Sequence, residues 1–271
     1  MVFVLPGIEG KGPISNGIAR GIRDGGWDGA VEVHDWGTPA GVLGWYVHLT
    51  DAGRNRAQAY RLARAIRHYQ VGYPNRPVYL VAHSGGAGIA VQAVEALPAE
   101  SPVDSVVLLG AALAPEYDLR RALGRTRRGV WNFHSRFDVG FLAAGTSVFG
   151  TVDRRHGPAA GAVGFRTPAH FEAADRRLYR AKLHQTPYSK RMAGSGHLGN
   201  HLGWASPRFA ADWLVPILDG TEPGARPRPG STGQDVAAGA GGIRRAATRV
   251  EEEVPRRAAS PVHEATPWEE R

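Results

Sequence analysis

A serine lies in the stretch AHSGG, where an apolar, strand-like run changes into a helical one. The run Val78–Val81 is typical of a buried strand, and Gly86–Leu97 is typical of a helix. A strand-to-helix turn that exposes a nucleophile needs small residues two positions on either side of it, and Ala82 and Gly86 are small. The N–H groups at the start of the helix could also stabilise a developing oxyanion. This pattern predicts that Ser84 is a nucleophile.

Two other interpretations of this stretch are a helix cap and a phosphate-binding loop. A serine before a helix is a common N-cap, but capping explains neither His83 nor the small flanking residues. The stretch HSGGAGIA lacks the lysine of a Walker loop. It also lacks the third glycine of a dinucleotide fingerprint, because Gly86-Ala87-Gly88 is followed by Ile89-Ala90-Val91. We therefore expect no cofactor.

A serine hydroxyl needs a base to take its proton and a carboxylate to orient that base. The apolar run Val130–Phe133 is followed by HSRFD, which puts Asp138 in a loop at a strand end. The later stretch AGSGHLGNHLGWASP supplies His197 and His201. The order Ser, Asp, His along the chain is the one expected for a nucleophile on a strand-to-helix turn.

The stretch VHDWG contains a histidine and an aspartate that could be mistaken for a metal site. His34 and Asp35 are too few, because zinc takes at least three protein ligands. We expect no metal here and interpret the pair as polar residues at the mouth of the sheet, with Trp36 as a wall of a pocket.

Taken together, AHSGG, HSRFD and GHLGNH resemble the nucleophile, acid and histidine loops of the α/β-hydrolase superfamily, in its serine esterase and lipase-like branch. The resemblance covers about residues 1–220 and implies hydrolysis of an acyl substrate through a Ser-His-Asp triad and an acyl-enzyme. The stretch LPGIEG looks like the oxyanion loop, with Pro6 in place of the usual histidine. The resemblance implies that the N–H groups of Ile8 and Gly85 form the oxyanion hole.

In this superfamily the base often lies shortly before the last helix, which favours His201 and leaves His197 as the alternative. Some members place the acid after the preceding strand, so Glu116 and Asp118 of APEYD are alternatives to Asp138. Larger members have two strands before the one that carries the oxyanion loop. Their absence here implies a reduced sheet of about six strands.

The elements that must position these residues alternate between strand and helix. Fully apolar strands separated by helices predict an α/β fold, with a mostly parallel open sheet and helices on both faces. In such sheets the sites lie at the carboxyl ends of the strands. The expected strands are Val2–Leu5, Val31–Val33, Val78–Val81, Val106–Leu109, Val130–Phe133 and a last one near Tyr188–Met192; the expected helices are Asp51–Tyr69, Gly86–Leu97 and one that opens at Ser206-Pro207.

Apolar residues near the expected site favour a substrate with an acyl or other hydrophobic group. Phe141 and Leu142 follow the acid loop directly, and Trp36 and Trp204 lie near the other predicted strand ends. Ordinary core packing is the alternative for all of them. Esters, thioesters and amides share the same acyl-enzyme chemistry, so the sequence does not distinguish among them.

The composition separates a folded part from a tail. Residues 221–271 are rich in Gly, Pro, Ala, Arg and Glu and have few large apolar side chains, so we expect a disordered tail after a domain of residues 1–220. The chain has no cysteine, no signal-peptide pattern and no apolar run long enough to span a membrane, which favours the cytoplasm.

The net charge of +8 raises the question of an anionic partner. The cluster from Arg120 to Arg128 could hold an anion, although charge runs are usually solvated, and we expect no nucleic acid. A binding protein that kept this fold without its chemistry is the other alternative, and the intact order of Ser, Asp and His disfavours it. The expected ligand is a small acyl substrate, and the sequence does not indicate an oligomeric state.

Overall fold

The structure, a computed structural model, describes residues 1–37, 51–138 and 157–224. These residues form one six-stranded sheet with the order β2-β1-β3-β4-β5-β6, and every neighbouring pair is parallel. The strands are β1 (Val2–Leu5), β2 (Val31–Val33), β3 (Tyr79–His83), β4 (Val103–Leu109), β5 (Thr126–His134) and β6 (Leu183–Pro187). The expected fold class is confirmed, and the described sheet has six strands, the number expected.

The central strands β1, β3 and β4 are largely apolar because both faces of the sheet are covered. In β1, Val2 and Val4 contribute to one hydrophobic cluster, while Phe3 and Leu5 contribute to the other. A strand whose side chains alternate between two buried faces must be apolar at every position. This explains why the continuous apolar runs in the sequence predicted these strands correctly.

The last strand lies earlier in the chain than expected. The sequence predicted it near Tyr188–Met192, but β6 ends at Pro187 and a 3₁₀ helix, η2, covers Lys190–Ser195. β6 reads LHQTP and lies at the edge of the sheet, where its residues are half-buried or exposed. An edge strand needs no continuous apolar run, so its sequence carries no strong strand signal.

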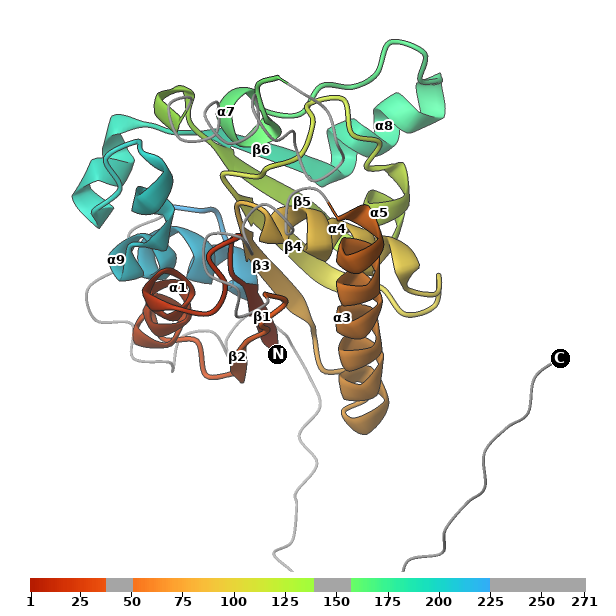
Figure 1. Cartoon of the computed structure of the whole chain (residues 1–271), viewed down its shortest axis with the longest axis horizontal. Helices are drawn as coiled ribbons and strands as arrows, with labels where there is room; N and C mark the ends of the chain where they lie inside the picture. Colours follow the sequence, from red (N-terminus) through yellow and green to blue (C-terminus); the bar gives the residue numbers. More distant parts are fainter. Residues whose placement is uncertain (38–50, 139–156, 225–271) are drawn as a thin grey trace, which may run out of the picture. The chain divides into compact units, whose positions relative to one another are not determined.

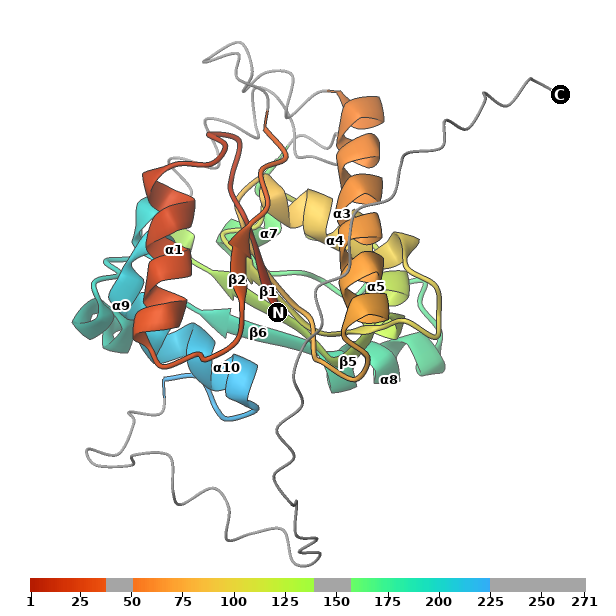
Figure 2. The same ribbon diagram turned by 90° about the horizontal axis from the view of Figure 1, so that it is seen from below.

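Helices cover both faces of the sheet (Figure 1). On one face lie α1 (Pro13–Asp24) and the final helical segment, which comprises α9 (Pro207–Phe209), the π-helical η4 (Ala210–Leu214) and α10 (Val215–Asp219). On the other face lie α3 (Ala52–Gly72), α4 (Gly86–Ala96) and α5 (Arg120–Gly124). Figure 2 shows α1 and α3 on opposite sides of the sheet. Two further helices, α7 (Ala160–Val163) and α8 (Ala173–Lys182), lie between β5 and β6 in the chain.

The loops that follow the strands meet at the carboxyl edge of the sheet, because all strands run in the same direction. These include the loop after β1, the turn from β3 into α4, the loop after β4 and the 3₁₀ turn η1 (Arg136–Asp138) after β5. The chain after β6 adds η2 and the 3₁₀ helix η3 (His201–Ala205). The residues predicted to be chemically active are therefore carried by loops that lie along one edge.

By its internal contacts the chain divides into two units, residues 1–227 and residues 228–271. The structure describes residues only up to Gly224. The predicted tail of residues 221–271 therefore stays a prediction. No helix in residues 1–37, 51–138 or 157–224 combines the length and the apolar character that a membrane span requires.

Candidate active site

The turn from β3 into α4 has the strained geometry expected of a nucleophile turn. Ser84 has a φ of 52°, a left-handed backbone conformation that costs a serine energy. Its N–H donates to the carbonyl of Leu109 at 2.9 Å, which ties the turn to the end of β4. Two positions on, a Cβ atom on Gly86 would overlap the carbonyl oxygen of Pro6, so only glycine fits there. This close contact is the physical reason why a small residue is needed at position 86, as the sequence indicated.

Asp138 and His201 form a buried pair beside this turn. The Nδ1 atom of His201 lies 2.9 Å from Oδ2 of Asp138, and the two residues are 3% and 1% exposed. Asp138 ends the turn η1, and His201 begins η3, whose first turn is capped by the side chain of Asn200. Ser84 is 6% exposed. The pair can hold an imidazole with its other nitrogen ready to accept a proton.

Trp204 holds the carboxylate of Asp138 from a second direction. Its indole Nε1–H donates to Oδ2 of Asp138 at 3.3 Å, and its side chain is fully buried. The turn after β4 makes room for both groups: Gly110 has a φ of 56°, and a Cβ atom there would lie 3.1 Å from Oδ2 of Asp138 and 3.0 Å from Nε1 of Trp204. Trp204 was expected to contact substrate, and in the structure it lies against the carboxylate.

His197 has a different environment from His201. Its ring packs on Trp204 with a centroid distance of 3.8 Å, and it also contacts the rings of Tyr188 and Phe209. Its Nδ1 accepts the N–H of Gly199 at 3.3 Å. Both its aromatic packing and its main-chain hydrogen bond are those of a core histidine, so the geometry favours His201 as the partner of Asp138.

Burial affects the protonation of both histidines. Burial lowers the pKa of His201 from its usual value, and the hydrogen bond with Asp138 acts in the opposite direction. Burial lowers the pKa of His197 to about 4, with the charge of Asp138 opposing the change. Both imidazoles are therefore neutral near pH 7, which is the state that a general base must have.

The predicted oxyanion loop lies against the start of α4. A Cβ atom on Gly85 would lie 2.7 Å from Cγ2 of Ile8 and 3.6 Å from the ring of Trp36. The indole N–H of Trp36 donates to the carbonyl of Pro6 at 2.8 Å, which fixes this loop from outside the strand. The side chain of Ile8 thus lies against the backbone of Gly85, so the oxyanion loop and the start of α4 are in contact.

The structure does not bring the alternative acids to His201. Glu116 forms an exposed ion pair with Arg166 at 3.1 Å, and Asp118 pairs with Arg120 at 2.7 Å. Among the described residues, no group of three or more histidines and acidic residues could hold a metal ion. The predicted substrate residues Phe141 and Leu142 lie outside the described residues.

Two residues that sequence analysis did not assign to the site lie beside it. The ring of His83 lies 4.6 Å from that of His201, centroid to centroid, and its Nδ1 is 3.6 Å from Oε1 of Glu9. Glu9 belongs to the LPGIEG stretch and His83 to AHSGG. Their positions in two motifs were visible in the sequence, but nothing in the sequence indicated that the two side chains meet.

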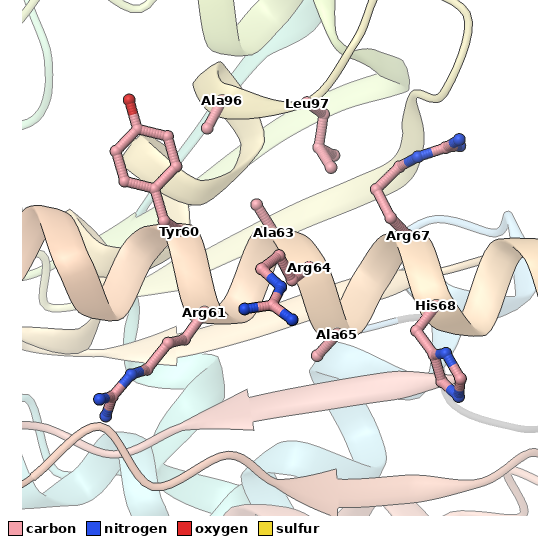
Figure 3. A pocket seen from close by; sticks show the side chains of 9 residues that line it. All are labelled: Tyr60, Arg61, Ala63, Arg64, Ala65, Arg67, His68, Ala96 and Leu97. Atoms are coloured by element: carbon pink, nitrogen blue, oxygen red, sulfur yellow. The ribbon is translucent and has the colours of Figure 1, made fainter. Parts of the chain in front are cut away.

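A groove of about 650 Å³ lies elsewhere, between α3 and the C-terminal end of α4 (Figure 3). It is lined by Tyr60, Arg61, Ala63, Arg64, Ala65, Arg67, His68, Ala96 and Leu97. Because α4 starts at the carboxyl edge of the sheet and ends at Ala96, this groove lies toward the opposite edge. It contains none of the predicted site residues.

Comparisons of the whole chain give matches at the level of structure. No protein-family model matches the sequence, and no curated protein sequence matches it. Lipase B from Aspergillus fumigatus matches with a TM-score of 0.51 and 14% identity, over 82% of this chain and 53% of the lipase. This chain thus spans about half of the length of the lipase.

A protein assigned to the α/β superfamily of hydrolases, from Xanthomonas campestris pv. campestris, matches less closely. Its TM-score is 0.43 at 18% identity, over 81% of this chain and 98% of that protein. At these identities the similarity concerns the fold alone.

Proposed function

We propose that this chain, which has the α/β-hydrolase fold, is a serine hydrolase that acts on a carboxylic ester or a related acyl compound. The observation that carries the proposal is the buried 2.9 Å contact between Asp138 and His201 on the same sheet edge as the strained Ser84. These three residues supply a nucleophile, a base and a carboxylate that orients the base. The fold shared with Aspergillus lipase B is compatible with this chemistry.

In the proposed reaction, the hydroxyl oxygen of Ser84 attacks the acyl carbonyl carbon and its proton passes to Nε2 of His201. Asp138 keeps the Nδ1–H of the imidazole in place and stabilises the imidazolium that forms. The N–H groups of Ile8 and Gly85 stabilise the oxyanion. His201 then protonates the leaving group, and a water molecule cleaves the acyl-enzyme by the same steps.

Exposed apolar side chains beside the site support a hydrophobic acyl group. Phe137, next to Asp138, is 75% exposed, and Leu202, next to His201, is 55% exposed. Leu198, in the same loop as His201, is also exposed. Large apolar side chains that face solvent around a site commonly contact apolar parts of a ligand.

The anion-binding alternative finds little support in the cluster from Arg120 to Arg128. Arg120 pairs with Asp118 and Asp175, and Arg127 pairs with Asp104. Two other arginines of the cluster donate to main-chain carbonyls: Arg125 to that of Leu97 and Arg128 to that of Leu218. Cations that are already paired within the domain are less available to an external anion.

The direct test is labelling of the purified full-length chain with a fluorophosphonate probe, followed by peptide mapping of the adduct. We expect a single adduct on Ser84, and no labelling of Ser84→Ala. Ser101→Ala is a matched control, because Ser101 is also a buried serine but contacts Arg67 of α3 and lies before β4, at the opposite edge of the sheet. Labelling that persists in Ser84→Ala would exclude the proposed nucleophile.

A further inference from the structure

A second carboxylate–imidazole contact lies directly beside the Asp138–His201 pair. Oε1 of Glu9, in the loop after β1, is 3.6 Å from Nδ1 of His83, the last residue of β3. The side chain of His83 is 1% exposed, and that of Glu9 is 24% exposed. The distance is long for a hydrogen bond but short enough for an ion pair, so the contact is mainly electrostatic.

The other ring nitrogen of His83 contacts the main chain of the proposed base. Nε2 of His83 lies 3.3 Å from the carbonyl oxygen of His201. A carbonyl oxygen only accepts hydrogen bonds, so Nε2 of His83 must carry a proton. Asp138 therefore holds the ring of His201, while His83 holds its backbone.

Glu9 extends the same chain of contacts to the oxyanion loop. Its Oε1 accepts the N–H of Gly7 at 3.0 Å, one residue before Ile8. The contacts then run from Gly7 through Glu9 and His83 to His201. They connect the predicted oxyanion loop, the strand that leads to Ser84 and the histidine loop, which are far apart in the sequence.

The geometry also bears on the protonation of the pair. Burial alone would raise the pKa of Glu9, but the interaction with His83 and the N–H of Gly7 bring that pKa below its usual value. The contact with His83 therefore favours the ionised form of Glu9.

We propose that Glu9 and His83 form a positioning pair that holds the oxyanion loop and the backbone of His201 in register with Ser84. The proposal rests on the serine hydrolase function proposed above. Neither residue reaches the reacting atoms; both act through the loops that they connect. A misplacement of about 1 Å in such loops can reduce turnover on the order of 100-fold.

The test measures hydrolysis of p-nitrophenyl butyrate by the full-length chain and its variants. We expect Glu9→Ala to lower kcat by about 10- to 100-fold with little change in KM. Glu9→Gln should recover most of the loss, because its amide oxygen can still accept the N–H of Gly7. Glu32→Ala is the matched control: it removes the carboxylate of another Glu–His contact, 3.9 Å from His34 on β2, and should leave kcat unchanged.

A pH profile separates positioning of the base from a general loss of stability. His83 is faced by Glu9 and His201, and His201 is faced by Asp138 and His83. Burial lowers the pKa of His201 and the neighbouring His83 lowers it further, so replacing His83 should raise that pKa. In His83→Phe we expect the acid limb of kcat/KM to move to higher pH, together with a fall in kcat.

Hydrogen exchange followed by mass spectrometry supplies a readout that does not depend on turnover. Peptides covering residues 6–10 and 197–203 should exchange faster in Glu9→Ala than in the parent chain or in Glu32→Ala. If the parent chain proves inactive and Glu9→Ala still exchanges faster than the parent, the positioning pair is upheld and the hydrolase function is rejected. Unchanged exchange in Glu9→Ala would overturn the positioning pair. The pair would also be overturned if Glu9→Ala and Glu9→Gln lost kcat equally and His83→Phe left the acid limb unshifted.

Discussion

His197 and His201 lie in one glycine-rich loop, yet their side chains meet different neighbours. His201 has a carboxylate 2.9 Å from Nδ1, whereas His197 has the ring of Trp204 on one side and those of Tyr188 and Phe209 around it. A base must be oriented by a carboxylate and must face the nucleophile. The residue-scale geometry therefore leads to opposite expectations for the two histidines.

We expect His201→Ala to reduce kcat as severely as Ser84→Ala, on the order of 10⁴-fold or more, because members of a triad act as a unit. His197→Ala should keep measurable turnover. We expect any reduction in its kcat to arise because the loop that carries His201 is less tightly packed. Asp138→Asn should fall between them, because it disturbs the tautomer of His201 and leaves the nucleophile in place. The measurement is steady-state hydrolysis of p-nitrophenyl acetate.

Two results of this series would have distinct meanings. If His197→Ala is inactive and His201→Ala is active, the assignment of the base is reversed. Near-native turnover in both variants would reject the triad. A circular dichroism spectrum of each variant serves as the control for folding.

At the scale of elements, the turns at the ends of β3 and β4 are built around specific backbone conformations. Ser84 and Gly110 both have positive φ values, 52° and 56°, at the carboxyl ends of neighbouring strands. The Gly110 turn brings the backbone close enough to Asp138 and Trp204 that no Cβ atom fits without a shift. This turn is thus part of the support for the acid.

We expect Gly110→Ala to lower both stability and kcat. The backbone conformation alone costs roughly 1–3 kcal/mol for a residue other than glycine. The new methyl group should in addition displace Asp138 or Trp204 by a few tenths of an ångström. Urea unfolding and ester hydrolysis measure the two effects.

Gly26→Ala is the matched control for this variant. Gly26 has a φ of 95°, but a Cβ atom there would meet nothing within 4 Å. It should therefore lose stability with no loss of kcat. Equal kcat values in Gly110→Ala and Gly26→Ala would contradict the supporting role of the β4 turn.

At the scale of the whole molecule, buried titratable groups link stability to pH. The pKa of His197 is about 4 in the folded chain, against about 6.5 for an unperturbed histidine. Below pH 6.5 the unfolded chain binds a proton that the folded chain excludes, so the stability due to neutral His197 is complete above that pH and is lost as the pH falls toward 4. The loss should be on the order of 3 kcal/mol.

Urea unfolding at pH 7 and pH 4.5 tests this expectation, and His197→Gln is the comparison because glutamine does not titrate. The parent chain should lose more stability than the variant over this interval. Burial raises the pKa of Glu95 to about 7, and its effect on stability has the opposite sign. Since both chains keep Glu95, the difference between them isolates His197; identical pH dependence would contradict the argument.

We also expect that the chain after Gly224 is dispensable. The N–H of Thr221 donates to the carbonyl of Pro216 at 2.7 Å, and that of Gly224 donates to Asp212 at 3.2 Å, so the domain keeps contacts up to this point. The residues beyond it contain few large apolar side chains. A chain ending at Gly224 should keep the melting temperature and the hydrolytic activity of the full chain, as measured by calorimetry and ester hydrolysis.

A fall in melting temperature or the loss of cooperative unfolding would show that the tail stabilises the domain. A chain ending at Gly220 is the companion variant, because it also removes the hydrogen bonds of Thr221 and Gly224. It should be less stable than the chain ending at Gly224.

The sequence by itself determined the fold class and the places where chemistry was expected. Continuous apolar runs identify strands that are buried on both faces, and this pattern depends only on local composition. The small residues around Ser84 likewise encode a tight turn locally. The sequence missed β6 because an edge strand that is half exposed has no such pattern.

Only the tertiary structure decided which side chains meet. His197 and His201 have nearly the same sequence surroundings, and packing alone brought one to Asp138 and the other to Trp204. The contact between Glu9 and His83 joins the loop after β1 to the end of β3, because these two strands are neighbours in the sheet. Contacts between residues far apart in the chain depend on how strands align and helices pack, and no local pattern of residue types records that alignment.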